Sequence, residues 1–216
     1  MTRLEAVIFD LDGLAVDSEP IQVEAWRGAV ESFGLPFEKR WIDPYYGTPV
    51  TATAAGLGRE LGLDPAELLR RRDERFERSV REGIPSRPGL GEAVSVLREH
   101  GLAVGLATSG TAAYARVILE RLEAEGVRFD AVVTRDDVSQ PKPDPEPYLL
   151  AAELLGADPA ACAVLEDSPN GIASAKAAGM TCVAIPTEHT LGLDLSGADS
   201  IREDLVAAVR WLLESG

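Results

Sequence analysis

The sequence predicts an α/β fold in which a doubly wound, Rossmann-like parallel sheet carries an inserted α-helical domain. In the second half of the chain, short apolar runs alternate with stretches of helical periodicity, which is typical of a parallel sheet covered on both faces. One more apolar run, at 4–9, is separated from this array by a block that shows helical periodicity as far as about residue 85.

The N-terminal part of the chain is predicted to hold one strand followed by helices. The run LEAVIF at 4–9 is typical of a short buried strand, and it ends in the turn DLDG. A helix is expected over 20–33, because Pro20 suits a first helical turn. Further helices are expected over 50–62 and 65–82, and the glycine- and proline-rich segment 83–91 indicates a hinge.

The rest of the chain is predicted to alternate between helix and strand. Helices are expected over 91–100, 111–125, 145–155, 169–178 and 203–214, and strands over 102–107, 129–133, 162–166, 181–185 and near 198–201. The predicted domains are therefore an α/β core formed by 1–14 and 87–216, and an α-helical cap formed by 15–86.

Composition excludes several classes of partner. The chain has 216 residues, of which 45% are apolar, and a formal net charge of -15, which argues against nucleic acid or an anionic membrane as partner. No segment has the length of a membrane span or the pattern of a signal peptide, so a cytoplasmic location is expected. Cys162 and Cys182 lie in apolar runs and are expected to be buried thiols, although a disulfide stays open.

Acidic residues follow two of the predicted strands. Asp10 and Asp12 come directly after the first strand, and Glu166 and Asp167 lie at the end of the strand 162–166. Because ligands of open parallel sheets bind at the carboxyl ends of strands, these carboxylates are expected to converge. Oxygen ligands of this kind suit Mg²⁺, whereas isolated aspartates in a solvated turn are the alternative.

Two further segments could oppose this negative charge. Lys142 lies between prolines in QPKPDP, which restrict the backbone around it, so it can either neutralise the carboxylates and a phosphate or remain on the surface. Thr108, Ser109 and Gly110 follow a strand and precede a helix. They could form an anion site or simply cap the helix.

Four segments, taken in order, resemble the motifs of the haloacid dehalogenase (HAD) superfamily. They are VIFDLDGLAVDSEP, GLATSG, QPKPDPEPY and VLEDSPNGIASAKAAGM, and together they span nearly the whole predicted core. The similarity is greatest to the subgroup with an α-helical cap, which includes β-phosphoglucomutase and many sugar-phosphate phosphatases. The resemblance implies a HAD core with a cap domain, and a Mg²⁺-dependent phosphohydrolase that forms a phospho-aspartyl intermediate.

The resemblance also implies roles for individual residues. Asp10 matches the nucleophile, Asp12 the general acid and base, Thr108 the residue that hydrogen-bonds the phosphoryl group, and Lys142 the lysine that steadies both. The remaining implied positions are Ser109, Gly110 and Glu19 for substrate, and Asp10, Asp12 (through its carbonyl), Glu166 and Asp167 for the metal.

Other activities of the same superfamily fit the residues less well. A dehalogenase needs no acid after the nucleophile, because a halide leaves without a proton, yet Asp12 is present. A phosphonate hydrolase would use a cap lysine, and Lys39 lies outside any recognisable motif. A catalytically inactive binding protein would be expected to have lost Asp10 or Asp12.

A phosphomutase is the main alternative. The β-phosphoglucomutase pattern has a histidine where this chain has Gln22, and an arginine near the segment Gly47-Thr48-Pro49-Val50. These differences favour hydrolysis of a monophosphate. The expected substrate is a small sugar or polyol phosphate and the expected state a monomer. Trp26 is expected to pack in the core, whereas Tyr45 and Tyr46 could either stack on a sugar or pack.

Overall fold

The chain divides into two compact units. The computed structural model describes residues 3–45, 50–188 and 190–215. One unit comprises residues 1–17 and 85–216, and the other comprises residues 18–84. Tyr46, Gly47, Thr48, Pro49 and His189 lie outside the described residues.

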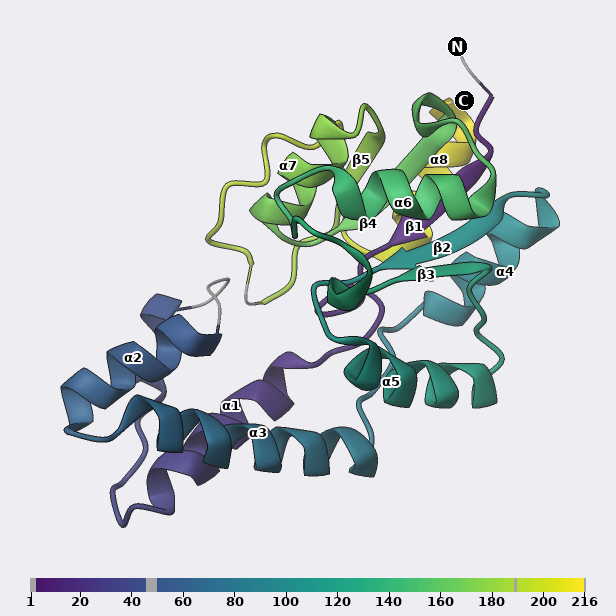
Figure 1. Ribbon diagram of the computed structural model, residues 1–216. Coiled ribbons are helices and arrows are strands. Elements are labelled where there is room, and N and C mark those ends of the chain that lie inside the picture. Colours follow the sequence, from purple (N-terminus) through teal and green to yellow (C-terminus); the bar gives the residue numbers. More distant parts are fainter. Residues whose placement is uncertain (1–2, 46–49, 189, 216) are drawn as a thin grey trace. The chain divides into compact units, whose positions relative to one another are not determined.

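A parallel sheet forms the centre of the larger unit, as predicted. Within the described residues it has six strands in the order β3-β2-β1-β4-β5-β6 (Figure 1), and every neighbouring pair is parallel. The strands are β1 (Ala6–Phe9), β2 (Ala103–Ala107), β3 (Ala131–Val133), β4 (Cys162–Glu166), β5 (Thr181–Ala184) and β6 (Ser200–Ile201).

Helices cover both faces of this sheet, so its central strands are buried. α6 packs on β1, β2 and β3, and α7 packs on β4 and β5, while α4 and α8 pack on each other and on the opposite face (Figure 1). The strand order explains this arrangement. From β1 to β3 the chain advances toward one edge of the sheet, and from β4 to β6 it advances toward the other edge. Because crossovers between parallel strands are right-handed, the connecting helices of these two halves lie on opposite faces. The helices are α4 (Leu90–Glu99), α5 (Ala112–Ala124), α6 (Glu146–Leu155), α7 (Pro169–Ala177) and α8 (Leu205–Ser215).

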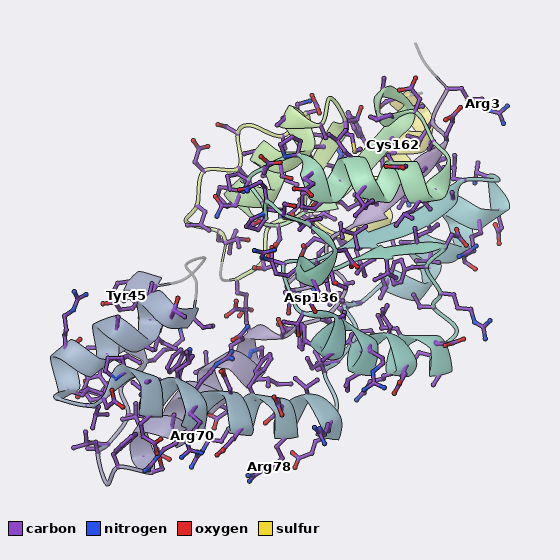
Figure 2. The ribbon with its side chains drawn as sticks, in the orientation of Figure 1. Arg3, Tyr45, Arg70, Arg78, Asp136 and Cys162 are labelled. Atoms are coloured by element: carbon purple, nitrogen blue, oxygen red, sulfur yellow. The ribbon has the colours of Figure 1, made fainter. Side chains whose placement is uncertain are left out.

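The core between the sheet and helices α6 and α7 is closely packed. Tyr148 is fully buried in it, together with both cysteines (Figure 2 labels Cys162). Gly105 lies in the middle of β2, where an added Cβ would come 2.9 Å from a methyl of Leu155, so the missing side chain lets α6 approach the sheet. Cys162 and Cys182 are buried free thiols, as expected from their apolar surroundings.

The described part of the smaller unit consists of three helices and short 3₁₀ turns. Trp26, Leu57 and Leu68 are buried at its centre, so Trp26 packs in the core as predicted. Arg70 and Arg78 lie on the outer, charged side of α3 (Figure 2). The elements are α1 (Glu19–Glu31), α2 (Val50–Leu61) and α3 (Pro65–Glu82), with 3₁₀ turns at Lys39–Trp41 and Asp43–Tyr45.

The chain leaves the larger unit and re-enters it at neighbouring backbone positions. The N–H of Asp17 donates to the carbonyl of Pro85 at 3.0 Å, and the N–H of Arg87 donates to the carbonyl of Ala15 at 2.9 Å. The segments on either side of the insertion are therefore tied together by backbone hydrogen bonds. In the described residues, no helix combines the length and apolar character needed to cross a membrane.

Two isoleucines in the sheet test how much the core contributes to stability. Ile8 in β1 is 0% exposed, whereas Ile201 in β6 is 47% exposed. We expect Ile8→Ala to lower the free energy of unfolding by about 2–5 kcal/mol, through lost burial and the resulting cavity. Ile201→Ala should change it by about 0.5 kcal/mol or less. Urea unfolding measures both, and equal losses would show that Ile8 is not part of a close-packed core.

Candidate active site

The register of the sheet brings the acidic strand ends together. Phe9 of β1 pairs with Leu106 of β2 and with Leu165 of β4. The next residue, Asp10, donates its N–H to the carbonyl of Leu165 at 3.1 Å. Asp10 and Glu166 therefore lie side by side at the carboxyl edge of the sheet, where the sequence predicted that the carboxylates converge.

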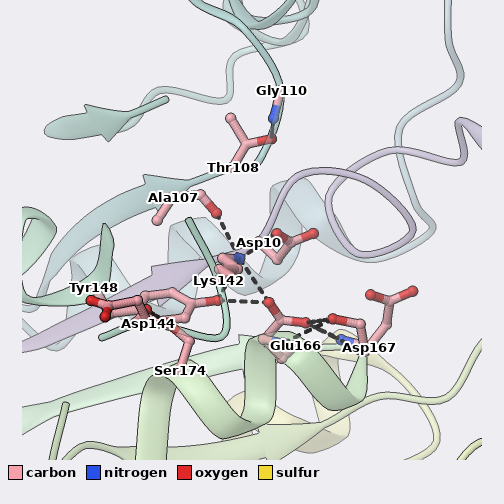
Figure 3. Close-up of polar contacts among 12 residues, drawn as sticks. Asp10, Ala107, Thr108, Gly110, Lys142, Asp144, Tyr148, Glu166, Asp167 and Ser174 are labelled. Carbon is pink, nitrogen blue, oxygen red and sulfur yellow. Dashed lines mark hydrogen bonds and ion pairs between the residues drawn. The ribbon is translucent and has the colours of Figure 1, made fainter. Parts of the chain in front are cut away.

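Lys142 lies at the centre of this edge (Figure 3). Its Nζ is 2.6 Å from Oδ1 of Asp10, 2.7 Å from Oε1 of Glu166, 2.7 Å from the Tyr148 hydroxyl and 3.1 Å from the carbonyl of Ala107. The side chain is 5% exposed. Since an ammonium has three N–H donors, these four acceptors saturate it. The predicted surface alternative for Lys142 therefore does not hold.

Hydrogen bonds also fix the loop that carries this lysine. The Glu146 carboxylate accepts from the N–H groups of Ser139 at 2.9 Å and Gln140 at 2.7 Å. On the other side of the lysine, the Ser174 hydroxyl donates to the carbonyl of Asp144 at 2.6 Å. The peptide bond between Lys142 and Pro143 is cis. The loop is thus anchored to α6 and α7 on either side of Lys142.

Glu166 is fully buried and its two carboxylate oxygens accept five hydrogen bonds. Oε1 accepts from Lys142 and, at 2.7 Å, from the hydroxyl of Tyr148. Oε2 accepts from the N–H groups of Asp167 and Ser168, both at 3.0 Å, and from the Ser168 hydroxyl at 2.9 Å. Two carboxylate oxygens offer about four lone-pair sites, so these donors occupy the acceptor capacity of Glu166.

Two glycines provide the space that these carboxylates fill. A Cβ on Gly13, where φ is +86°, would lie 2.2 Å from Oδ2 of Asp167. A Cβ on Gly171, in the first turn of α7, would lie 1.6 Å from Oε1 of Glu166. Any other residue would force either carboxylate away, so both glycines are needed to hold the acidic cluster.

The acidic cluster has the composition of a divalent-cation site. One carboxylate oxygen from each of Asp10, Glu166 and Asp167 lies within 4.8 Å of the others. Asp10 is 8% exposed and Asp167 is 7% exposed, so water does little to screen their repulsion. These oxygen donors fit Mg²⁺, which prefers a few carboxylates.

The pKa values of these groups follow from their burial and from the excess of three carboxylates over one ammonium group. Burial raises the pKa of Asp10 to about 8, with Lys142 opposing this shift and Glu166 adding to it. Burial also raises the pKa of Asp167 well above its usual value, and the charges of Glu166 and Asp10 reinforce it.

Lys142 and Glu166 are shifted toward their charged forms instead. Burial alone would raise the pKa of Glu166, but the charge and hydrogen bond of Lys142 outweigh it and lower that pKa. Burial would lower the pKa of Lys142, but the charges of Asp10 and Glu166 raise it. The Lys142 ammonium thus keeps Glu166 in its ionised form. Asp10 and Asp167 require further positive charge to ionise.

Thr108 lies at the same edge of the sheet, after β2. It is buried, its N–H donates to the carbonyl of Val133 at 2.9 Å, and its Oγ1 accepts from the N–H of Gly110 at 2.9 Å. Ser109 is exposed. The N-cap of α5 is Thr111, so the capping role that the sequence left open for Thr108 or Ser109 belongs to a later residue.

The other predicted site residues fall in two places. Asp12 is half-buried beyond β1, and its Oδ1 accepts a short hydrogen bond from the hydroxyl of Tyr114 on α5. Glu19 is half-buried in the first turn of α1, in the helical unit, and its contact with substrate stays a prediction. In the same unit, Tyr45 lies against α2, where a Cβ on Gly56 would meet its hydroxyl at 1.9 Å.

Sequence reasoning missed two polar side chains of the site, Tyr148 and Tyr114. Tyr148 stands inside a quoted motif, six residues after Lys142, so its place near that lysine in the sequence could have indicated it. Ser168, which the sequence indicates as a helix cap, is the N-cap of α7 and also donates to Glu166. Tyr114 follows the GLATSG segment by four residues, and nothing in its local pattern distinguishes it from an ordinary helical residue.

Comparison with known proteins identifies the family. Residues 7–185 match the family of haloacid dehalogenase-like hydrolases. The chain belongs to this family. The resemblance inferred from the four motifs is therefore confirmed, and the matched region spans the sheet edge described above.

Relatives in this family include both hydrolases and mutases. The chain is 37% identical over 179 residues to a phosphorylated carbohydrates phosphatase of Thermotoga maritima, covering 82% of each protein. It is 31% identical over 202 residues to the β-phosphoglucomutase of Bacillus subtilis, covering 89% of this chain and 88% of that protein. The crystal structure of a HAD family hydrolase from Deinococcus radiodurans, with bound phosphate and sodium, has a TM-score of 0.84 at 26% identity, covering 100% of this chain and 98% of that one.

Replacing the buried lysine should cost far more stability than replacing an exposed one. Lys176 pairs with Asp199 at 2.6 Å, as close as Lys142 to Asp10, but its side chain is 39% exposed. In EDTA at pH 7, we expect Lys142→Met to lower the free energy of unfolding by about 3 kcal/mol, because it leaves buried carboxylates without a cation. Lys176→Met should cost about 1 kcal/mol or less. Urea unfolding tests this, and similar losses for both variants would contradict the assigned burial.

Binding of Mg²⁺ should compete with protons. Without metal the pKa of Asp10 is about 8, so this carboxyl is mostly protonated at pH 7 and must lose its proton to bind the ion. The apparent affinity should rise as the pH increases from 6 toward about 8, roughly tenfold per unit for each proton displaced. Calorimetric titration at pH 6 to 9 measures it. Asp194→Asn, at an exposed position, should behave like the unaltered protein, and affinity that is independent of pH would refute the prediction.

Proposed function

We propose that the chain is a Mg²⁺-dependent phosphatase that cleaves a small phosphomonoester through a phospho-aspartyl intermediate on Asp10. The observation that carries the proposal is the position of Lys142, which lies between Asp10 and Glu166 at the carboxyl edge of the sheet, 2.6 Å and 2.7 Å from their oxygens. The nucleophile, its counter-charge and the acidic cluster are thus assembled in the core unit.

In the first half-reaction a carboxylate oxygen of Asp10 attacks phosphorus. The bond between phosphorus and the leaving oxygen breaks as the bond to Asp10 forms, and the Asp12 carboxyl gives its proton to the leaving oxygen. Lys142 holds Oδ1 of Asp10, which orients the nucleophile and offsets negative charge on the phosphoryl oxygens. Thr108, together with Ser109 and Gly110, would hydrogen-bond those oxygens.

In the second half-reaction water hydrolyses the acyl phosphate. Asp12 is now ionised and takes a proton from the water. The water oxygen attacks phosphorus as the bond between phosphorus and Asp10 breaks. Inorganic phosphate leaves, the Asp10 carboxylate is restored, and Asp12 is again a proton donor. Both proton transfers therefore pass through the same carboxyl group.

The side chains of Asp10 and Asp167 and the carbonyl of Asp12 would hold the magnesium ion. When bound, it supplies the positive charge that Lys142 alone cannot provide to these carboxylates and to the phosphate. Glu166 borders the site, but the five hydrogen bonds that it accepts support a role in holding Lys142 and the start of α7. Ionisation of Asp10, which nucleophilic attack requires, is favoured once that charge is present.

The expected substrate is a sugar or polyol phosphate. The similarity to a phosphatase of phosphorylated carbohydrates supports this class. Glu19 of the helical unit is expected to contact the substrate. A monomer acting in the cytoplasm is the expected working form.

A β-phosphoglucomutase-type phosphomutase is the second candidate, favoured by the similarity to the Bacillus subtilis enzyme. Against it, the position of the mutase histidine is Gln22. The side-chain carbonyl of Gln22 accepts a short hydrogen bond from the buried Arg72 within the helical unit. A neutral amide held in this way cannot offer the positive charge with which a protonated imidazole would help to hold a second phosphate.

Phosphate release from a panel of phosphate esters distinguishes the two candidates. The panel contains sugar, polyol and short carboxylic-acid phosphates, including β-glucose 1-phosphate, each assayed with Mg²⁺ and with EDTA. Metal-dependent release from a few members supports the phosphatase. Conversion of β-glucose 1-phosphate to the 6-phosphate after addition of a bisphosphate primer, without net release, supports the mutase. Release that is unaffected by EDTA would contradict both.

Replacing the nucleophile should abolish turnover without unfolding the protein. We expect Asp10→Asn to lower kcat by about 10⁴-fold or more, because an amide cannot form the acyl phosphate. The variant should unfold at a similar urea concentration, since the asparagine side chain keeps the shape of the aspartate and its carbonyl oxygen can still accept the hydrogen bond from Lys142. Asp194→Asn serves as the matched control and should keep full activity. Metal-dependent turnover retained in Asp10→Asn would rule out Asp10 as nucleophile.

A further inference from the structure

Tyr114 contacts the residue to which we assign both proton transfers. Its hydroxyl donates a short hydrogen bond to Oδ1 of Asp12, which lies 102 residues earlier in the chain. Tyr114 stands in the first turn of α5, and both residues belong to the core unit. The contact is therefore made within the core and depends on no residue of the helical unit.

The start of α5 holds Tyr114 firmly in this place. The N–H of Tyr114 donates to the N-cap side chain of Thr111 at 3.3 Å, and the N–H of Ala112 donates to the Asp136 carboxylate at 2.9 Å. The ring lies over Gly110, where an added Cβ would come 2.5 Å from Cδ1 of Tyr114. Gly110 thus provides the space that the ring needs to reach Asp12.

We propose that Tyr114 is a positioning residue that orients the Asp12 carboxyl for proton transfer. This inference rests on the proposed function of Asp12. Because Oδ1 accepts the phenolic hydrogen bond, the transferred proton is assigned to Oδ2. It passes from Oδ2 to the leaving oxygen as the phosphorus–oxygen bond breaks, and returns to Oδ2 from the attacking water. Tyr114 keeps its own proton throughout.

The role predicts a dependence on the leaving group. An alcohol or sugar leaves as a strong base and needs the proton from Asp12, whereas p-nitrophenolate is a weak base that can leave without it. Loss of the Tyr114 hydroxyl should therefore slow the cleavage of an alkyl phosphate more than the cleavage of p-nitrophenyl phosphate. A purely structural role of Tyr114 would slow both by the same factor.

The experiment measures kcat/KM for both kinds of ester, since this constant reports the steps up to phosphoryl transfer to Asp10. It uses the sugar or polyol phosphate that the unaltered protein cleaves best, and p-nitrophenyl phosphate, both with Mg²⁺. We expect Tyr114→Phe to lower the ratio of the alkyl to the aryl constant by about tenfold, a part of what general acid catalysis contributes. Asp12→Asn should lower this ratio further.

One more variant separates the hydroxyl from the ring, and another serves as a control on the same helix. Tyr114→Leu removes both and should lower the ratio at least as much as Tyr114→Phe. Arg116→Ala changes an exposed residue of the same helix, whose side chain is 73% exposed, and should leave the ratio unchanged. A normal ratio in Tyr114→Phe, with a low ratio in Tyr114→Leu, would assign the effect to packing and overturn the proposal.

The outcome is separable from failure of the proposed function. If the unaltered protein shows no metal-dependent cleavage of any ester, or if Asp12→Asn keeps the normal ratio, the assignment of Asp12 is wrong. If Asp12→Asn lowers the ratio and Tyr114→Phe does not, Asp12 is the acid and Tyr114 does not position it. Thermal unfolding of each variant shows that the comparison is made between folded proteins.

Discussion

The arrangement of the core depends on one buried ammonium group. Lys142 joins Asp10, directly after β1, to Glu166 of β4 and Tyr148 of α6 at distances of 2.6–2.7 Å. Taking such charges out of water is costly, and the cost is offset only when every donor and acceptor is matched. The matched partners of Lys142 and Glu166 meet this condition. Moving α6, the loop before it or either strand would leave a buried charge without its partner.

The same constraint explains how a strongly acidic protein can bind a phosphate ester. The chain carries a formal net charge of -15, and at the sheet edge one lysine faces the three carboxylates of Asp10, Glu166 and Asp167. Lys142 keeps Glu166 ionised, while the pKa values of Asp10 and Asp167 stay high. A dianionic substrate would add to this imbalance, so the substrate and a divalent ion are expected to bind together.

Local patterns in the sequence were sufficient to predict the sheet, its helices and the acidic edge. Parallel strands buried on both faces give continuous apolar runs, and the predicted site residues stand at the ends of these runs or directly after them. A run such as 162–166 therefore indicates both a strand and part of the candidate site. Predicted boundaries lie within two residues of the observed ones, both at the central strand β1, which begins at Ala6 and not at residue 4, and at the edge strand β6, which is reduced to Ser200–Ile201.

The polar groups that support the site could not be predicted in the same way. The contact of Tyr114 with Asp12 spans 102 residues, and that of Tyr148 with Glu166 spans 18. Such pairs exist only once α5 and α6 have packed on the sheet. A helical pattern identifies the buried side of a helix, but it does not show which polar atom a tyrosine hydroxyl will reach. The saturation of Glu166 likewise depends on the fold of the turn at Asp167 and Ser168.

The paired backbone segments around the insertion have a consequence for how this protein could change over time. Asp17 and Pro85 are hydrogen-bonded neighbours at 3.0 Å, so the two ends of the inserted segment meet at a single point on the core. A segment of different length, or a short turn, could be spliced between them without altering the register of the sheet or the polar contacts of Lys142. The core can therefore be conserved as a fixed chemical unit, while the inserted segment is free to diverge or be exchanged as recombination and selection for new substrates demand.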